Sequence, residues 1–301
     1  MKPAALARHK RKARAWIYNH KPRGFLIHRG PSQMPGLTGD APDVITLVSL
    51  YSENAKLGRD TYQTWHLIAD EHPLEMRRGG CGDAGICGDC VFRAKPGQKV
   101  GPCYPDGRGI VSLYRSNQAG NYPPIEALAK HLKLNVLDTL AVLGSLPASV
   151  RLGAYGDPVS MPFAVGEALT LYSEEHQGFC HQWKRMGATP WRRLLMASCE
   201  LPEQLAQAAA LGWRTYTAYP PELTERQARK AIANASGRLV LAGCPATKEK
   251  GMLVNCETCP IQCNGGDAKW HVINKVHGAS SAMGRYNALG FGPRWAEAAQ
   301  C

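Results

Sequence analysis

The distribution of apolar residues divides the chain into an irregular first part and a regular remainder. Two short apolar runs, at 43–51 and 61–68, predict buried strands. Between residues 79 and 109, glycine, proline and cysteine replace any hydrophobic periodicity. A loop of this length in a compact domain is usually functional and needs another source of order, which metal binding could supply. The early chain therefore predicts two strands followed by a functional loop.

From about residue 124 onward, helical and strand-like segments alternate. Helices are expected in 125–146 (one or two pieces), 163–172, 203–211 and 224–235, and strands at 150–155, 178–183, 194–198, 213–218, 239–242 and 270–276. Thr224 and Gln227 have the spacing of a capping box at the start of the last helix. Strands that alternate with helices indicate βα units and a parallel sheet. We therefore expect an α/β fold, a full or partial (βα) barrel with cysteine-rich loops.

Composition indicates a cytoplasmic protein without a membrane partner. The chain has 301 residues, of which 44% are hydrophobic and 20% charged, so it can bury a large core. No apolar run approaches the ~20 residues that cross a bilayer. The N-terminus is basic but lacks an apolar stretch followed by a cleavage site. In a reducing compartment, clustered cysteines are more often metal ligands than disulfides.

Eight of the eleven cysteines form two compact groups. The first group reads C-x5-C-x2-C-x12-C and the second C-x11-C-x2-C-x3-C; their members are Cys81, Cys87, Cys90 and Cys103, and Cys244, Cys256, Cys259 and Cys263. A C-x2-C step lets two thiolates of one turn bind the same metal or cluster. Both groups are therefore predicted metal sites, for zinc or for an iron–sulfur cluster. His271 or His277 could replace a cysteine of the second group.

Polar residues follow several of the expected strands. Tyr155-Gly156-Asp157-Pro158 ends one strand, and Asp157 either belongs to a site or caps the next helix. The next strand ends in a polar cluster of candidate substrate contacts: His181, Gln182, Lys184 and Arg185. Ser198 lies at the end of the following strand. Since functional residues of parallel sheets follow the carboxyl ends of strands, we expect these residues and both cysteine groups to meet at one edge.

The net charge of +12 and the pI near 9.3 point to a polyanionic partner, DNA or a nucleotide. Residues 1–39 carry many of the cations and no acid, with Trp16 and Tyr18 between them. Such a segment can neutralise phosphates and stack on bases, although a solvated arm is the alternative. The expected organisation is a basic arm and linker at 1–42, the barrel with both cysteine groups at 43–277, and a C-terminal tail at 278–301.

Together these features resemble radical S-adenosylmethionine (SAM) enzymes, specifically the divergent radical-SAM-like proteins of bacteriophages. Cys81, Cys87 and Cys90 resemble the three-cysteine loop that holds a [4Fe-4S] cluster and leaves one iron open for SAM. The usual spacing in the family is C-x3-C-x2-C, with an aromatic residue beside the last cysteine. Here Tyr104 follows Cys103. The third ligand is therefore open between Cys81 and Cys103.

Two further segments carry the resemblance. Tyr155-Gly156-Asp157-Pro158 is similar to the Gly-Gly-Glu-Pro motif that holds the amino end of SAM, with Asp157 in place of glutamate. Ser198 is a further candidate for contact with this cofactor. The second cysteine group resembles the C-terminal groups that hold an auxiliary cluster in many relatives, and either a second [4Fe-4S] cluster or zinc is expected there.

The resemblance implies an enzyme that needs an electron donor and abstracts hydrogen from a modified nucleobase in phage DNA, in the host cytoplasm. The implied reaction is the isomerisation of an amino-acid-substituted thymine. Two alternatives remain open. One is a queuine-type base transglycosylase, with zinc on Cys256, Cys259, Cys263 and His277 and with Asp157 as nucleophile. The other is a non-enzymatic zinc protein that binds nucleic acid.

Overall fold

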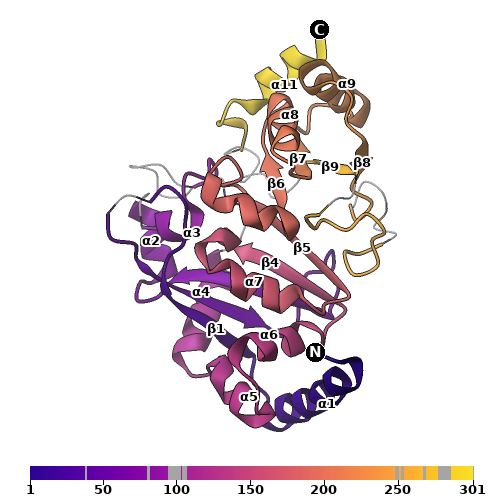
Figure 1. The fold of residues 1–301 in the computed structure, drawn as a ribbon. Helices are drawn as coiled ribbons and strands as arrows, with labels where there is room; N and C mark the ends of the chain where they lie inside the picture. The colour runs from indigo at the N-terminus through magenta and orange to yellow at the C-terminus, as the bar shows by residue number, and fades with distance from the viewer. Residues whose placement is uncertain are drawn as a thin grey trace.

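The computed structural model describes residues 1–37, 39–79, 82–93, 103, 107–247, 251, 254–266, 269–276 and 286–300. Within these ranges one nine-stranded sheet forms the centre of the fold, in the order β1-β2-β3-β4-β5-β6-β7-β9-β8 (Figure 1). The strands are β1 (Gly24–Pro31), β2 (Asp43–Ser49), β3 (Thr61–Ile68), β4 (Ser149–Tyr155), β5 (Glu175–Cys180), β6 (Met196–Cys199), β7 (Thr215–Tyr219), β8 (Leu241–Gly243) and β9 (His271–Lys275).

The sheet combines an antiparallel part with a parallel part. β1, β2 and β3 pair antiparallel, whereas every pair from β3 to β8 is parallel. From β3 to β7 the neighbours in the sheet are also neighbours in the chain, as expected for successive βα units. β9 then enters between β7 and β8. The carboxyl ends of β3, β4 and β5 therefore lie side by side at one edge.

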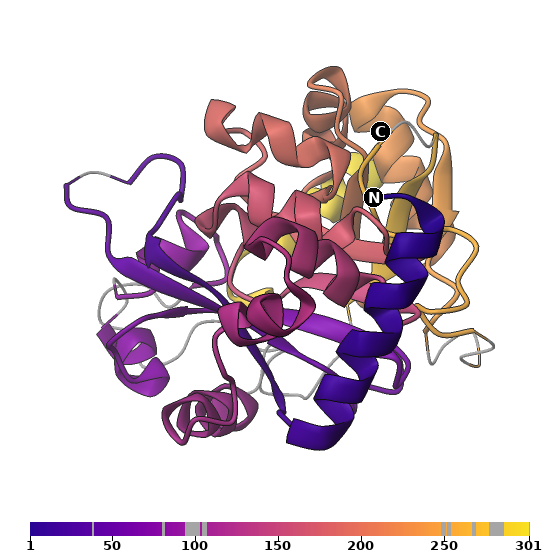
Figure 2. The same ribbon diagram turned by 60° about the horizontal axis from the view of Figure 1, so that its bottom comes forward.

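The helices pack in groups at different places along the sheet. The α-helices are α1 (Pro3–His20), α2 (Pro73–Gly79), α3 (Ala84–Cys87), α4 (Gly107–Gln118), α5 (Ile125–Leu132), α6 (Val136–Gly144), α7 (Phe163–Thr170), α8 (Pro202–Ala210), α9 (Glu225–Ser236) and α11 (Phe291–Gln300), and the 3-10 helices are η1 (Pro158–Ser160) and η2 (Met186–Arg193). α1 packs on α5 and α6, away from the group formed by α8, α9 and α11 (Figures 1 and 2).

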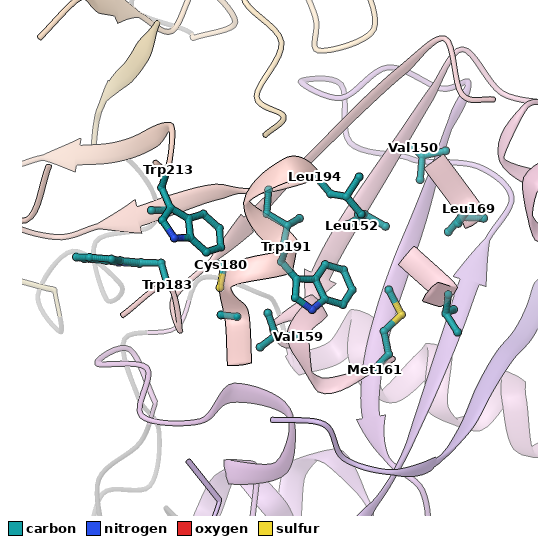
Figure 3. Packing of buried hydrophobic residues seen from close by; sticks show 14 of the residues in the cluster. Val150, Leu152, Val159, Met161, Leu169, Cys180, Trp183, Trp191, Leu194 and Trp213 are labelled. Atoms are coloured by element: carbon teal, nitrogen blue, oxygen red, sulfur yellow. The ribbon is translucent and has the colours of Figure 1, made fainter. Parts of the chain in front are cut away.

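The main core lies between the parallel strands and their helices. Figure 3 shows this core around Trp191 of η2, with Leu152 of β4 and Met161 near its ring. Phe163 meets Trp191 edge-on, with the ring centroids 5.3 Å apart. Gly166 permits this packing, because a Cβ atom at this position would lie 2.6 Å from the indole of Trp191. Burial of large apolar side chains of this kind supplies most of the stabilisation of such a layer.

The α/β class is confirmed, and the sheet is open: β1 and β8 form its two edges. The strands expected at 43–51, 61–68 and 150–155 are present as β2, β3 and β4. The strand expected at 178–183 begins earlier, at Glu175, and ends at Cys180. The predicted capping box is confirmed, since Thr224 and Gln227 bond reciprocally at the start of α9.

Residues 1–42, expected to be an arm and a linker, contain α1 and β1. The reason is that cations occupy only part of the helix surface, while Leu6, Trp16 and Ile17 pack against the core. Trp16 reaches the buried Phe25 of β1, with ring centroids 5.6 Å apart. The described part of the tail is likewise packed: Trp295 of α11 is fully buried and donates to Glu200 O at 3.0 Å. Every helix in the described ranges is too short or too polar to span a bilayer.

Candidate functional site

The first cysteine group lies in a compact turn after β3. Cys87 is the last residue of α3, and Cys90 follows with its backbone N–H donating to Cys87 O at 3.1 Å. Cys103 is attached to the same turn, because its N–H donates to Phe92 O at 3.0 Å. Burial raises the pKa of the Cys87 thiol well above its usual value, and Asp83, Cys103 and Cys90 raise it further. Cys90 and Cys103 therefore each lie within electrostatic range of Cys87, and Cys81 lies outside the described residues.

Arg93 supports the turn from within. Its Nε donates to Asp83 Oδ1 at 2.7 Å, and its Nη1 donates to Gly88 O. Gly88 has a φ of 56°. The positive charge of Arg93 also opposes the rise in the pKa of Cys87. The turn is thus held by a buried ion pair as well as by its backbone.

The cysteine turn is bonded to the carboxyl ends of β4 and β5. The backbone N–H of Asp157 donates to Ile86 O at 2.6 Å, and Gln182 Nε2 donates to Cys87 O at 3.0 Å. Gly156 allows this approach: its φ is 74°, and a Cβ atom would lie 2.7 Å from His66 Cβ. The sequence therefore places the first group at the ends of three consecutive parallel strands.

Asp157 joins two strand ends rather than facing a cavity. Its Oδ2 accepts from the backbone N–H of His181 at 2.7 Å, and its Oδ1 accepts from Val159 N at 3.3 Å at the start of η1. Burial raises the pKa of Asp157, while His181 and the backbone amides of the loop oppose this rise. Of the two sequence interpretations, the capping role is the one in the structure.

His181 connects the cysteine turn with the end of β6. Its Nδ1 lies 3.2 Å from Glu200 Oε1, and the ring meets Phe92 edge-on at 5.7 Å. Burial alone would lower the pKa of His181, but Cys90, through charge and a hydrogen bond, and Glu200 raise it well above its usual value. Sequence reasoning did not select Glu200. The sequence feature that could identify Glu200 is an acidic residue directly after a short apolar strand.

The other predicted contacts divide into two sets. Arg185 pairs with Asp89 of the cysteine turn at 2.8 Å, and Gln182 is buried with its Oε1 lacking a partner. Lys184 instead lies over the ring of Trp183, with the Nζ 5.0 Å from the centroid. Ser198 contributes its carbonyl, which accepts from Trp183 Nε1 at 3.0 Å, and Tyr155 is part of the core beside the turn. His181, Gln182 and Arg185 are therefore the ones that contact the turn.

The second cysteine group lines a separate cavity of about 20 Å³. The described part of its wall consists of Cys244, Cys256, Cys259 and Cys263 together with Ser149, Glu175, His176, Gln177, Pro245, Ala246, Ile261, Gln262 and Val272. Burial raises the pKa of Cys263, and the three other thiols add to this rise. Burial also raises the pKa of Cys256. Cys256 and Cys263 thus lie within electrostatic range of each other and of both Cys244 and Cys259.

The two groups lie at opposite ends of β4 and β5, so the expectation of one shared edge was wrong. The cavity touches Ser149 and Glu175, the first residues of these strands, whereas the first group bonds to Asp157 and Gln182, which follow them. At about 3.3 Å per residue, about 13 Å separates Gly178, which bonds Cys263 O, from Gln182, which bonds Cys87 O. In Figure 1, α3 and the loop after β8 lie on opposite sides of these strands. After β8 the chain returns toward these strands, and Cys263 O accepts from the backbone N–H of Gly178, in the middle of β5, at 3.1 Å.

Arg214 organises the loop of the second group. This arginine is 4% exposed and donates to five acceptors on one loop and one neighbouring residue: Ile261 O, Gln262 O, Asn264 O, Asn264 Oδ1 and Trp270 O, at 2.7–3.3 Å. Gln262 has a φ of 44°, an uncommon value for a residue with a side chain. Its Nε2 donates to Glu175 Oε1. Sequence reasoning missed Arg214, because a single arginine before a strand carries no motif.

The thiols of both groups have the chemistry of ligands for a thiophilic metal. In the described ranges no three His, Cys, Asp or Glu side chains already stand at ligating distances. The four thiols nevertheless share one cavity wall, and Glu175 Oε2 is buried there without a partner. Thiolate sets of this kind suit zinc or an iron–sulfur cluster. Of the two alternative histidine ligands, His271 bonds Thr215 Oγ1 at 2.9 Å and His277 lies outside the described residues.

The chain was compared with protein-family models, with curated proteins and with solved structures. None of the three comparisons found a match. The function is therefore inferred from the geometry and chemistry of the site.

Proposed function

We propose that this protein is a radical SAM-type iron–sulfur enzyme that acts on a modified nucleobase in DNA. The observation that carries the proposal is the bonding of the Cys87–Cys90 turn to the carboxyl ends of β4 and β5. In open α/β sheets, cofactors bind outside the carboxyl ends of the strands. A cysteine turn held at that edge is in the position where a cofactor-binding cluster is useful.

Cys87 and Cys90 would hold the cluster together with Cys103 or Cys81. Cys103 is favoured by its bond to Phe92 and its electrostatic contact with Cys87. A [4Fe-4S] cluster with three cysteine ligands would supply, with SAM and an electron donor, the one-electron chemistry that abstracts hydrogen from carbon. His181 is the residue that would tune this site, because it bonds the Cys90 side chain and is itself held by Glu200.

The second group would hold its own zinc ion or cluster. Cys263 O accepts from Gly178 N, whereas Gln182, about 13 Å further along at 3.3 Å per residue, bonds Cys87 O, so we assign separate ligands to the two sets. A fully ligated four-thiolate metal has no open position for a substrate. Its role would be to stabilise the loop after β8 or to relay electrons.

Cations beside the first site support an anionic substrate. Lys184 and Arg185 are exposed in the loop after β5, next to His181 and Gln182. Together with the net charge of +12, they favour a nucleotide within DNA over a small neutral molecule. The finer proposal, isomerisation of an amino-acid-substituted thymine in phage DNA, extends this site to the reaction class that the sequence resemblance implies.

The transglycosylase alternative is disfavoured by Asp157. A nucleophilic aspartate must present a carboxylate oxygen to its substrate. Both oxygens of Asp157 instead accept backbone N–H groups, and the residue is buried. The zinc-binding alternative retains support from the four-thiol cavity, but it assigns no role to the contact between Cys90, His181 and Glu200.

Metal analysis of matched variants tests the proposal. After anaerobic purification, iron, sulfide and zinc are quantified in the wild type, in a Cys87→Ala/Cys90→Ala variant and in a Cys256→Ala/Cys259→Ala variant, with Cys199→Ala as a control thiol outside both groups. We expect about four irons to be lost in the first variant and retained in the control, and SAM cleavage to depend on Cys87 and Cys90. Zinc without iron in the wild type would refute the iron–sulfur proposal and support the zinc-binding alternative.

A further inference from the structure

One surface of α1 carries an exposed stripe of cations and one aromatic ring. Arg8, Arg11 and Lys12 are exposed, and Tyr18 is 77% exposed. Their spacing of three, four and seven residues places them along one side of the helix. We call this set the α1 stripe.

The charge of the α1 stripe is not neutralised within the described chain. Arg8, Arg11 and Lys12 take part in none of the ion pairs there. The neighbouring α5, which contacts α1, and the residue after it carry two further exposed cations, Lys130 and Lys133. The acids on the adjoining helices are Glu126 of α5 and Asp138 of α6. The cations therefore outnumber the acids on this part of the surface.

The other side of α1 is already occupied, which excludes insertion into a membrane. His9 and Ala13 are buried, and Leu6, Trp16 and Ile17 pack against the core. An amphipathic helix that binds a membrane needs its apolar side available for the lipid. Only the cationic side of α1 is exposed, so the surface fits a polyanion rather than an acyl layer.

We infer that the α1 stripe is a docking surface for the phosphate backbone of DNA, separate from the candidate cofactor site. Arginine and lysine side chains neutralise phosphates, and an exposed tyrosine can stack on an unpaired base. The inference rests on the proposed DNA substrate but not on the proposed cofactor. In this inference α1 retains the DNA and takes no part in the chemical reaction.

The position of α1 defines what this surface can do. Arg14 Nη2 donates to Leu146 O at 3.3 Å, and the N-terminal amine of Met1 donates to the Tyr172 hydroxyl. Leu146 and Tyr172 precede β4 and β5, so α1 lies at the strand starts, opposite the candidate cofactor site. A nucleotide on α1 is therefore not the one at Cys87. At about 3.4 Å per base pair, DNA must extend at least ~6 base pairs to reach both, and binding at α1 raises its local concentration at the site.

The salt dependence of DNA binding tests the α1 stripe directly. We would measure the Kd of a duplex of about 30 base pairs, well above the minimum span, and of its single strand by fluorescence anisotropy across a salt series. In an Arg8→Gln/Arg11→Gln/Lys12→Gln variant, the slope of log K against log salt for the duplex should become shallower by about 2 to 3. Tyr18→Ala should weaken single-strand binding by about tenfold and affect the duplex less.

A matched variant at the other end of the molecule controls for net charge. Arg226→Gln/Lys230→Gln/Arg238→Gln removes the same number of exposed cations from α9 and the segment after it, far from α1 in Figure 1. We expect its slope to stay within about one unit of the wild type. An unchanged slope in the α1 variant, or an equal loss in the control, overturns the inference.

Two further measurements distinguish DNA docking on α1 from unfolding and from membrane binding. Thermal melting should show that the α1 variant remains folded, because none of its three substituted residues is buried. Binding to phosphatidylserine vesicles with no binding to DNA would also overturn the inference in favour of a membrane surface. If the protein contains no iron but the α1-dependent slope persists, the cofactor proposal fails and the docking surface stands.

Discussion

Replacement of Arg214 should loosen the loop that carries the second cysteine group. The guanidinium reaches four backbone carbonyls and the side-chain oxygen of Asn264 from one buried position before β7. Burial lowers the pKa of Arg214, and Cys263 opposes this shift. The change with the clearest interpretation is Arg214→Lys, which keeps the positive charge but replaces a planar five-donor group with three donors on one atom.

The expected loss of stability follows from the number of acceptors that lysine cannot reach. One ammonium group has three protons, so at least two of the five acceptors lose their partner. Each hydrogen bond to a charged group contributes about 1.5 to 3 kcal/mol when the partner is buried. The free energy of unfolding should therefore fall by about 3 to 6 kcal/mol, a large part of the ~5–15 kcal/mol that is typical of a folded domain.

Urea denaturation measures the loss of stability, and hydrogen exchange of residues 254–266 locates it. Retention of the metal proposed for the second group gives a third readout, since Gln262 and Cys263 lie in the affected loop. The matched control is Arg193→Lys, which alters an exposed ion pair with Glu167 at 2.8 Å. Exposed pairs contribute about 1 kcal/mol or less, so this variant should behave like the wild type.

Two results would refute the reasoning. One is an Arg214→Lys variant with wild-type stability and full metal occupancy, which would mean that the loop is organised by something other than the guanidinium. The other is a loss of stability with unchanged hydrogen exchange at 254–266, which would place the effect elsewhere in the sheet.

Three further predictions use single positions. Gly156→Ala should cost about 2 kcal/mol in urea denaturation, because its φ of 74° and the 2.7 Å approach to His66 leave no room for a Cβ atom; stability equal to the wild type would refute this. Thr224→Ala should lower the unfolding free energy by about 1 kcal/mol by removing the capping box of α9, and restoration by Thr224→Ser would confirm the cause. Burial, with His28 adding to it, lowers the pKa of His66 from 6.5 to about 3, so only the unfolded chain binds this proton as the pH falls below about 6.5. The wild type should therefore lose about 2 kcal/mol more stability than His66→Gln between pH 7 and pH 5, and equal losses would contradict the assignment.

The strands that were predictable are rich in apolar residues, and no Asp, Glu, Lys or Arg stands between the apolar residues of β2 and β3. Val44 to Leu50 and Tyr62 to Ile68 contain enough buried apolar positions to identify β2 and β3 directly. β5 starts with Glu175, His176 and Gln177, because these residues border the second cavity rather than the core. The hydropathy pattern therefore predicted that β5 starts at residue 178, later than its start at Glu175 in the structure. The sequence did not lead to a prediction of α1. Arg and Lys are good helix formers, but the high charge of this segment indicated a binding surface and not a helix.

The separation of the two cysteine groups could not be predicted from spacing. It depends on where the chain goes after β8, and β9 enters between β7 and β8 instead of extending the sheet. With β9 in this position, the loop that carries Cys256 returns to the segment before β3. There Cys256 N donates to Lys56 O at 2.8 Å. Local sequence determines which cysteines can share one turn. The order of strands determines which turns meet.

The hydrogen bonds of Asp157 bear on which residues of the first site we propose as contacts for a cofactor. The residue that best matched a cofactor motif has both carboxylate oxygens bonded to backbone amides, and it fixes the ends of β4 and β5 relative to each other. A carboxylate engaged in this way positions the backbone of its neighbours. We therefore propose that the residues positioned by Asp157, rather than Asp157 itself, would contact a cofactor. His181 already bonds Cys90, and Gln182 contacts Cys87 O while its own Oε1 remains unpartnered. Gln182 is therefore the residue with an unused hydrogen-bonding group beside the cysteine turn, and its substitution should affect the site without separating the two strands.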